Sequence, residues 1–288
     1  MADAATIGWI ISYPKSGNTW LRLMLLSLMQ GGAAVDINGI GNEAGLANHV
    51  EMDELLVVES SELFPDEQMA AQPNLNMAIA AETGPGLKLR KVHDRYWRTP
   101  AGTAIFPASV SRGAVYIVRD PRDVAVSLSH HRGIAVDSVI AAMADPTATL
   151  SESIDRQRRQ LAQPLGDWSG HVRSWIEQRD IPVLLLRYED LLADPAQGLR
   201  SIADHLGIAH DARAVQAAVD ATRFDRLRAQ EQAHGFTERK PGSTAPFFRE
   251  GSAGGWRSDL TSEQATRILT DHGDAMRQLG YACGAGGT

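Results

Sequence analysis

GWIISYPKSGNTWLRLMLLSL, the sequence of residues 8–28, joins an apolar run, a short polar loop and a second apolar segment of different spacing. The run at residues 9–11 shows no helical amphipathicity, so it predicts a short buried strand that Pro14 brings to an end. Beyond the loop, apolar side chains recur at helical spacing, at Leu21, Met24, Leu25 and Leu28. The stretch therefore predicts a strand, a tight turn and a helix in direct succession.

The loop between strand and helix, KSGNT at residues 15–19, has the composition of an anion site. Gly17 lets the backbone turn its N–H groups toward a bound group, and Lys15 adds a full positive charge. A helix that begins directly after such a loop also presents its free amides and the positive end of its dipole. We therefore expect residues 15–19 to bind a phosphate or a sulfate.

The same loop is not a standard ATP-type phosphate loop. That pattern places its Lys after the second Gly and follows it with Ser or Thr, whereas here Lys15 precedes Ser16 and Gly17. On its own, the loop is equally compatible with a surface turn that ends in a helix cap at Asn18 or Thr19. Other parts of the chain have to decide between these two interpretations.

Length and charge narrow the class of protein. The 288 residues, of which 43% are hydrophobic and 22% charged, fit one large globular domain or at most two. The formal net charge of -7 argues against a nucleic-acid partner, so an anionic ligand has to be bound by a local cluster of cations.

The cysteine and histidine content argues against disulfides and metal sites. Cys283 is the single cysteine, which excludes an intramolecular disulfide and any site with several thiolate ligands. The nine histidines offer no pair at ligand spacing with a third partner. The start MADAAT lacks the features of a secretory signal and no apolar run approaches membrane-spanning length, so we expect a cytoplasmic protein without a metal or a membrane partner.

Three further segments are typical of strands. Residues 87–93, LKLRKVH, alternate apolar and basic side chains, and residues 114–118 and 182–187 are short apolar runs. The first of these two runs leads into a helix with Asp120 as N-cap and Pro121 as first helical residue. Strands that are separated by helices and apolar enough to be buried on both faces predict an α/β fold with a central parallel sheet flanked by helices.

Amphipathic spacing predicts further helices at about residues 167–178, 199–206, 211–219 and 261–279. Gly207 is expected to close the second of them. Residues 31–86 read as loops and short helices, and residues 134–165 as a candidate lid or insertion. The glycine-rich residues 247–260 read, by themselves, as a flexible connector.

Five patches, in this order, resemble the motifs of one enzyme family. They are YPKSGNTW (13–20), KVH (91–93), VYIVRDPRDVAVS (115–127), LRYEDLLADP (186–195) and REGSAGGW (249–256). Together they closely resemble the cytosolic-type sulfotransferases, which transfer a sulfuryl group from 3′-phosphoadenosine 5′-phosphosulfate (PAPS) to an acceptor. The resemblance implies that residues 1–288 form a single sulfotransferase domain, with residues 15–19 as a P-loop-like site for the phosphosulfate.

PAPS carries a 5′-phosphosulfate and a separate 3′-phosphate, so its site needs two anion-binding centres. The resemblance implies that the whole first loop holds the phosphosulfate: Lys15, Ser16, Gly17, Asn18 and Thr19. For the 3′-phosphate it implies Arg119, Ser127, Arg249, Glu250 and Gly251, of which Glu250 stands where the family has Lys. For the adenine it implies a sandwich with Trp20 and Phe224, and Tyr188 and Thr222 as hydrogen-bonding neighbours.

Lys91 and His93 lie two residues apart on one predicted strand, so their side chains share one face. By the resemblance, His93 takes the proton of the acceptor hydroxyl as the hydroxyl oxygen attacks sulfur. Lys91 and Lys15 then stabilise charge on the sulfuryl oxygens and the leaving phosphate. The unperturbed pKa of histidine, about 6.5, suits a base near neutral pH.

Two other functions remain open from the sequence. A nucleoside kinase would use the same cradle and α/β pattern, but the Gly-Lys-Ser/Thr order that it needs is missing. A catalytically silent nucleotide-binding protein is disfavoured by the presence of both Lys15 and His93. Binding of a 3′,5′-bisphosphate nucleotide without magnesium would exclude the first, and turnover would exclude the second.

The acceptor, a small molecule with a hydroxyl or an amine, is not readable from the sequence. It is expected between residues 33–86, 134–165 and 234–248, which carry no specific resemblance. The aromatic residues that either line an apolar pocket there or only pack are Tyr96, Trp97, Phe247 and Phe248. A basic cluster, Arg156, Arg158 and Arg159, reads as a solvated helix face or as a contact for an anionic acceptor.

The oligomeric state is expected to be monomeric, with a homodimer as the alternative. The family's short dimer motif, Lys-X-X-X-Thr-Val-X-X-X-Glu, falls on residues 257–266 of this chain. Only Thr261 matches it, because Ser262 replaces the apolar residue and Thr266 the acid.

Overall fold

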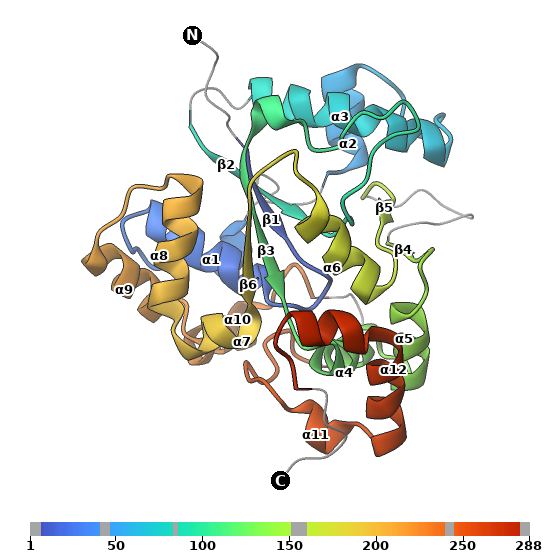
Figure 1. Cartoon of the computed structure of the whole chain (residues 1–288). Helices are drawn as coiled ribbons and strands as arrows, with labels where there is room; N and C mark the ends of the chain where they lie inside the picture. The colour runs from blue at the N-terminus through green and yellow to red at the C-terminus, as the bar shows by residue number, and fades with distance from the viewer. Residues whose placement is uncertain (1–6, 41–46, 83–85, 151–159, 240–244, 283–288) are drawn as a thin grey trace.

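The computed structural model describes residues 7–40, 47–82, 86–150, 160–239 and 245–282. Its centre is a parallel sheet in the order β2-β1-β3-β6 (Figure 1). The strands are β1 (Ile7–Ile11), β2 (Lys88–Val92), β3 (Ser111–Val118) and β6 (Val183–Arg187), and β4 (Thr149–Leu150) pairs separately with β5 (Gln163–Pro164). The predicted α/β fold with a parallel sheet is confirmed.

Helices cover both faces of the sheet (Figure 1). They are α1 (Asn18–Met29), α2 (His49–Leu56), α3 (Pro65–Glu82), α4 (Pro121–Arg132), α5 (Val136–Met143), α6 (Trp168–Glu177), α7 (Tyr188–Ala193), α8 (Pro195–Leu206), α9 (Ala212–Ala221), α10 (Phe224–His234), α11 (Trp256–Asp259) and α12 (Ser262–Gln278), with 3-10 turns at Ile37–Ile40 and Ala108–Val110. Helices α1, α8 and α9 pack on one face, and α4, α5, α6 and α12 lie on the other.

The side chains of β3 alternate between two apolar cores. Tyr116 and Val118 belong to the core under α4, α6 and α12, whereas Val115 and Ile117 belong to the core under α1, α8 and α9. All four side chains are at most 1% exposed. Because both faces of this strand are covered, its sequence is a continuous apolar run rather than an alternating one.

Two expectations about elements are wrong. β6 is an edge strand with Leu185 36% exposed, so it is not buried on both faces. Helix α3 has 18 residues and packs Leu75 and Ile79 into the larger core, although only loops and short helices were expected there. Its Ala- and Gln-rich sequence contains few large apolar side chains, so the pattern did not indicate a long helix.

The strand order places a ligand crevice beside β1. The chain passes from β1 to β2 on one side and later to β3 on the other, and both strands run parallel to β1. In open parallel sheets, ligands bind outside the carboxyl ends of the strands at such a reversal of order. The loop after β1 lies at that position.

Candidate active site

Each strand of the central sheet carries a predicted site residue just beyond its carboxyl end. The loop at residues 15–19, predicted to bind the phosphosulfate and called the phosphosulfate loop below, follows β1, and His93 follows β2. Arg119 follows β3 and Tyr188 follows β6. Since the strands are parallel, these residues meet at one edge of the sheet.

The tight turn before α1 depends on Gly17. Its φ is 103°, and a Cβ at this position would lie 2.7 Å from the Tyr188 ring. Lys15 also has a positive φ, 69°, which is uncommon for a residue with a side chain. The surrounding contacts therefore hold the loop in a backbone conformation that its sequence alone would not favour.

The interpretation of the loop as a turn capped by Asn18 or Thr19 is wrong. The N-cap of α1 is Gly17, which supplies no side-chain hydrogen bond. Asn18 Nδ2 donates instead to the carbonyl of Ile10 (2.9 Å), and Thr19 Oγ1 donates to Glu238 Oε2 (2.8 Å). The first amides of α1 are left without a side-chain cap and can bind an anion.

Two buried polar atoms beside the loop, Ser16 Oγ and Arg119 Nε, have no hydrogen-bond partner among the described residues. Ser16 is completely buried. Buried polar groups are nearly always paired in folded proteins, so these two atoms are candidates for contacts with a bound anion. Together with the uncapped amides and Lys15, they fit phosphate or sulfate oxygens.

A small cavity of about 20 Å³ lies against the loop and is rich in cations. Its lining residues are Lys15, Ser127, His130, His131, Arg239, Ala245, Pro246, Phe247 and Arg249. Lys15 Nζ lies 4.0 Å from the ring centroid of Phe247. Phe247 therefore covers part of the Lys15 ammonium group in this cavity.

The ring of His93 is fixed in one tautomer. Nδ1 lies 2.7 Å from the carbonyl oxygen of Ser12, which can only accept, so Nδ1 carries the proton. Nε2 is then unprotonated, as a general base requires. Burial, and next the charge of Lys91, hold the pKa of His93 well below its ordinary value. The pKa of His93 therefore departs from the unperturbed histidine value of about 6.5, and the ring is neutral throughout the neutral pH range.

The two predicted catalytic lysines influence each other. Burial, then the charges of Lys91 and Arg119, lower the pKa of Lys15 to about 8. Burial likewise lowers the pKa of Lys91 to about 8, although the carboxylate of Glu238 raises it. Both side chains are mostly protonated at pH 7, and a bound anion would raise both pKa values.

Arg119 links the first loop to the glycine-rich segment at residues 249–256. Nη1 donates to the carbonyl of Lys15 (3.2 Å), and Nη2 donates to the carbonyl of Ser252 (3.0 Å). The guanidinium lies 4.6 Å from the ring centroid of Tyr188. The segment expected to be a flexible connector is therefore docked against the phosphosulfate loop.

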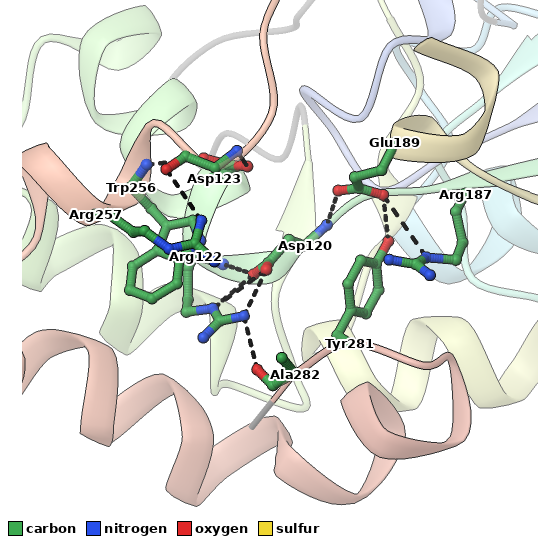
Figure 2. Close-up of polar contacts among 10 residues, drawn as sticks. Asp120, Arg122, Asp123, Arg187, Glu189, Trp256, Arg257, Tyr281 and Ala282 are labelled. Atoms are coloured by element: carbon green, nitrogen blue, oxygen red, sulfur yellow. Dashed lines mark hydrogen bonds and ion pairs between the residues drawn. The ribbon is translucent and has the colours of Figure 1, made fainter. Parts of the chain in front are cut away.

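Acidic side chains hold this arrangement together (Figure 2). Asp123 Oδ2 accepts from the amide of Gly254 (2.7 Å), and Oδ1 accepts from the amide of Trp256 (2.9 Å). Glu189 accepts from the amide of Asp120 (3.0 Å), which joins the chain after β6 to the chain after β3. These contacts fix the backbone that follows Arg119 and the segment at residues 254–256.

The residues predicted for adenine lie near one another. Trp20 Nε1 donates to the carbonyl of Thr222 (3.1 Å), and the Trp20 ring lies edge-on to Tyr188 with 6.0 Å between centroids. Gly251, with φ 62°, lies so close to Phe224 that a Cβ would come within 2.3 Å of the ring. The hydroxyl of Thr222 donates back into α9, so its proton is already used.

The departure at Glu250 has a visible consequence. Ser127 and Arg249 line the small cavity with Lys15, as expected for a phosphate site. Arg249 Nη1 lies 3.1 Å from Glu250 and 3.7 Å from Asp259. Glu250 thus gives Arg249 an acidic neighbour in place of the second cation that the family has.

Sequence reasoning missed three residues of this region. Arg22 is completely buried in α1, and its Nη2 lies 2.5 Å from Glu238. A lone arginine in an otherwise apolar helix was an available signal, because a buried charge needs a partner. Nothing around Glu238 indicated its role. His171 Nε2 donates to the carbonyl of His93 (3.0 Å) and accepts at Nδ1 from Tyr116, which no motif indicated.

Of the remaining candidates, Phe247 lies against Lys15, and the others pack in the apolar cores or lie outside the described residues. Tyr96 and Trp97 pack against the larger core, and Phe247 and Phe248 pack with Phe236. The basic cluster Arg156, Arg158 and Arg159 and the single cysteine Cys283 lie outside the described residues. Over the described ranges, no helix is long and apolar enough to span a bilayer, and no three metal-ligating side chains cluster.

Comparison with known proteins identifies the family. Residues 7–280 match the sulfotransferase domain family, so the chain belongs to it. Rat sulfotransferase 1C2 is 25% identical over 266 residues, covering 90% of this chain and 79% of the relative. Mouse sulfotransferase 1B1 is 26% identical over 270 residues, with the same coverage of 90% and 79%. The expected enzyme class, a PAPS-dependent sulfotransferase, is confirmed.

Solved structures agree with this assignment at the level of the fold. Retinol dehydratase in complex with androsterone and inactive cofactor PAP gives a TM-score of 0.59 at 18% identity, covering 94% of this chain and 80% of that one. Mouse sulfotransferase SULT7A1 complexed with PAP gives 0.54 at 19% identity, covering 96% and 86%.

Proposed function

We propose that this chain transfers the sulfuryl group of PAPS to the hydroxyl, or alternatively the amine, of a small molecule. One observation carries the proposal: His93, neutral and unprotonated at Nε2, lies close to Lys91, whose charge also acts on Lys15 in the loop before the uncapped start of α1. PAPS supplies an activated sulfuryl group. The chain then has to bind it, orient an acceptor and remove one proton.

His93 is the proposed general base. The Ser12 carbonyl holds the Nδ1 proton, so the lone pair of Nε2 can receive the proton of the acceptor hydroxyl. The lowered pKa makes His93 a weaker base than free imidazole but keeps it in the active form at every neutral pH. Lys91 and Lys15 are positioned to offset negative charge on the sulfuryl oxygens and on the leaving phosphate.

Two anion centres are proposed, one in the loop itself and one between α4 and the segment at residues 249–252. The amides after Gly17, the hydroxyl of Ser16 and the ammonium of Lys15 form the first, for the phosphosulfate. Arg119 and the cavity containing Ser127 and Arg249 form the second, for the 3′-phosphate. Trp20 and Phe224 are the proposed neighbours of adenine.

The acceptor is proposed to bind among the segments expected to vary. A second cavity of about 330 Å³ is lined by Leu128, Arg132, Val139, Ala142, Met143, Asp145, Thr147, Ala148, Thr149, Leu165 and Tyr13. Most of these residues belong to the segment 134–165, and Tyr13 packs edge-on against His171, the residue that holds the His93 backbone. The volume suits a small organic molecule.

The cytoplasm is the proposed compartment.

A screen of candidate acceptors tests the proposed function. The protein is incubated with PAPS and a mixed set of alcohols, phenols and amines, and products are detected by mass. A gain equal to one SO₃ group is expected on at least one acceptor, and it should vanish when PAPS is replaced by ATP with magnesium. Phosphoryl transfer from ATP with no sulfuryl transfer from PAPS would overturn the proposal.

A further inference from the structure

Glu238 lies inside the proposed active site, although its segment was expected to contact only the acceptor. Its Oε2 accepts from Thr19 Oγ1 (2.8 Å), in the first turn of α1. Its Oε1 accepts from Arg22 Nη2 (2.5 Å) and lies 3.5 Å from Lys91 Nζ. One carboxylate therefore connects the cofactor helix with the proposed catalytic lysine on β2.

The position of this carboxylate is fixed from within the fold. Arg22 is completely buried, and its Nε donates to Asn18 Oδ1 (3.0 Å). Asn18 Nδ2 in turn donates to the carbonyl of Ile10 in β1 (2.9 Å). A chain of hydrogen bonds thus runs from the central strand to Glu238. The ε-amino group of Lys91 ends a flexible side chain. We infer that the fixed carboxylate of Glu238 determines where this amino group lies.

Among the residues that the structure describes, the other charged or titratable groups near Lys91 do not favour its protonated form. Arg22 from α1 and Lys15 from the loop repel it, and His93 on its own strand is neutral. Glu238 is the group that raises the pKa of Lys91 against burial. The pKa of Glu238 is itself lowered to about 2: burial raises it, but the charges of Lys91 and Arg22 outweigh burial.

We propose that Glu238 is a positioning residue for Lys91, which keeps the ε-amino group protonated and holds it at the carboxyl end of β2, where the sulfuryl oxygens have to lie. A buried ion pair contributes little to stability on its own, because desolvation offsets the attraction. The Arg22–Glu238–Lys91 arrangement is therefore better explained by what it does to Lys91. The role of protonated Lys91 in sulfuryl transfer rests on the proposed function, whereas the effect of Glu238 on the protonation of Lys91 does not.

Lysine side-chain NMR tests this effect without cofactor or acceptor. The chain has four lysines, Lys15, Lys88, Lys91 and Lys240, so labelled lysine side chains give few signals, and Lys91→Arg identifies the one that matters. In Glu238→Gln, the amide oxygen can still accept from Arg22 and the amide NH₂ can donate to Thr19 Oγ1, while the negative charge is lost. We expect the pKa of Lys91 to fall by roughly one unit.

Glu231→Gln is the matched control. Glu231 is a second acidic residue of this region: it accepts from the amides of Phe247 (2.6 Å) and Phe248 (2.9 Å), and it does not figure among the charges that act on Lys91. We expect the titration of Lys91 to be unchanged in this variant. An equal fall in both variants would show that loosening of the segment, and not the carboxylate, acts on Lys91, and would overturn the proposal.

Glu238→Gln should also change the pH dependence of turnover. Because Lys91 has to be protonated, the fall of kcat/KM at high pH should begin at lower pH in Glu238→Gln. If Glu238→Gln does not fold, Glu238→Asp keeps the charge at a shorter reach and should give a smaller fall in the Lys91 pKa. If Glu238→Gln folds and the titration of Lys91 is unchanged, the proposal is overturned, whatever the affinity of the variant for PAP. Because the Lys91 titration needs no turnover, it tests this proposal even if the protein transfers no sulfuryl group.

Discussion

At the scale of single residues, His93 separates chemistry from binding. Its ring contacts Ser12, and it follows β2 rather than the phosphosulfate loop, so His93→Ala should leave both anion centres in place. We expect turnover to fall by about 10² to 10⁴-fold, the usual contribution of a general base. The dissociation constant for PAP, measured by calorimetry, should stay close to that of the wild type. Near-wild-type kcat on an aliphatic alcohol would show that His93 is structural.

The pKa shifts of the site predict an unusual pH profile. Burial and the charge of Lys91 lower the pKa of His93, so its ring stays neutral at neutral pH. Activity should therefore be lost only at a pH well below about 6.5, the ordinary pKa of histidine. Since Lys15 and Lys91 have pKa values of about 8, kcat/KM should fall as pH rises through about 8. Bound anions raise both lysine pKa values, so the corresponding fall in kcat should occur at higher pH. An acid limb near the ordinary histidine value would contradict this assignment.

Residue types were easier to predict than their electrostatic environment. Lys15, Lys91, His93 and Arg119 could be predicted as site residues because their motifs have specific spacing, and in the structure they lie at one edge of the sheet. The lowered pKa of His93 arises from burial and from Lys91, which depend on packing that the sequence does not display. Glu238 could not be found, because its partners are more than 140 positions away in sequence, as its separation of 147 from Lys91 shows.

At the scale of elements, Arg119 tests the connection between two loops. Removing its guanidinium in Arg119→Ala should weaken PAP binding by about 10- to 100-fold, the range for a lost charge-assisted hydrogen bond. The 3′-phosphate is remote from the reacting sulfur, so KM for PAPS should rise while kcat remains attainable. Competition assays with PAP and with adenosine 5′-phosphate measure the preference for the 3′-phosphate, which the variant should lose. A fall in kcat at unchanged KM would place Arg119 at the wrong end of the nucleotide.

Element boundaries were predictable where capping residues marked them. Asp120 caps α4 by accepting from the amide of Arg122, and Gly207, with φ 68°, ends α8 as expected. The sequence did not predict the features that depend on where an element lies in the folded chain. Nothing in the residues of β6 indicates an edge strand, and the burial of α3 follows from its place on the sheet rather than from its own periodicity.

At the scale of the whole molecule, a monomer remains the prediction. Thr261, the residue that matches the dimer motif, caps α12 in a reciprocal arrangement with Gln264. Its presence is explained by helix capping, so the match gives no support for an interface. Light scattering at micromolar concentration should give the mass of one chain. Twice that mass would contradict the prediction and point to a different contact surface.

Binding of PAP without magnesium tests the central claim, that the carboxyl edge of the sheet holds a nucleotide with two separate phosphate centres. A ligand that binds only the folded protein raises its melting temperature, by an amount set by concentration over Kd. We predict a clear rise with PAP in the presence of a chelator, and a smaller rise with adenosine 5′-phosphate at the same concentration. No rise with saturating PAP, together with a clear one with ATP and magnesium, would contradict the account.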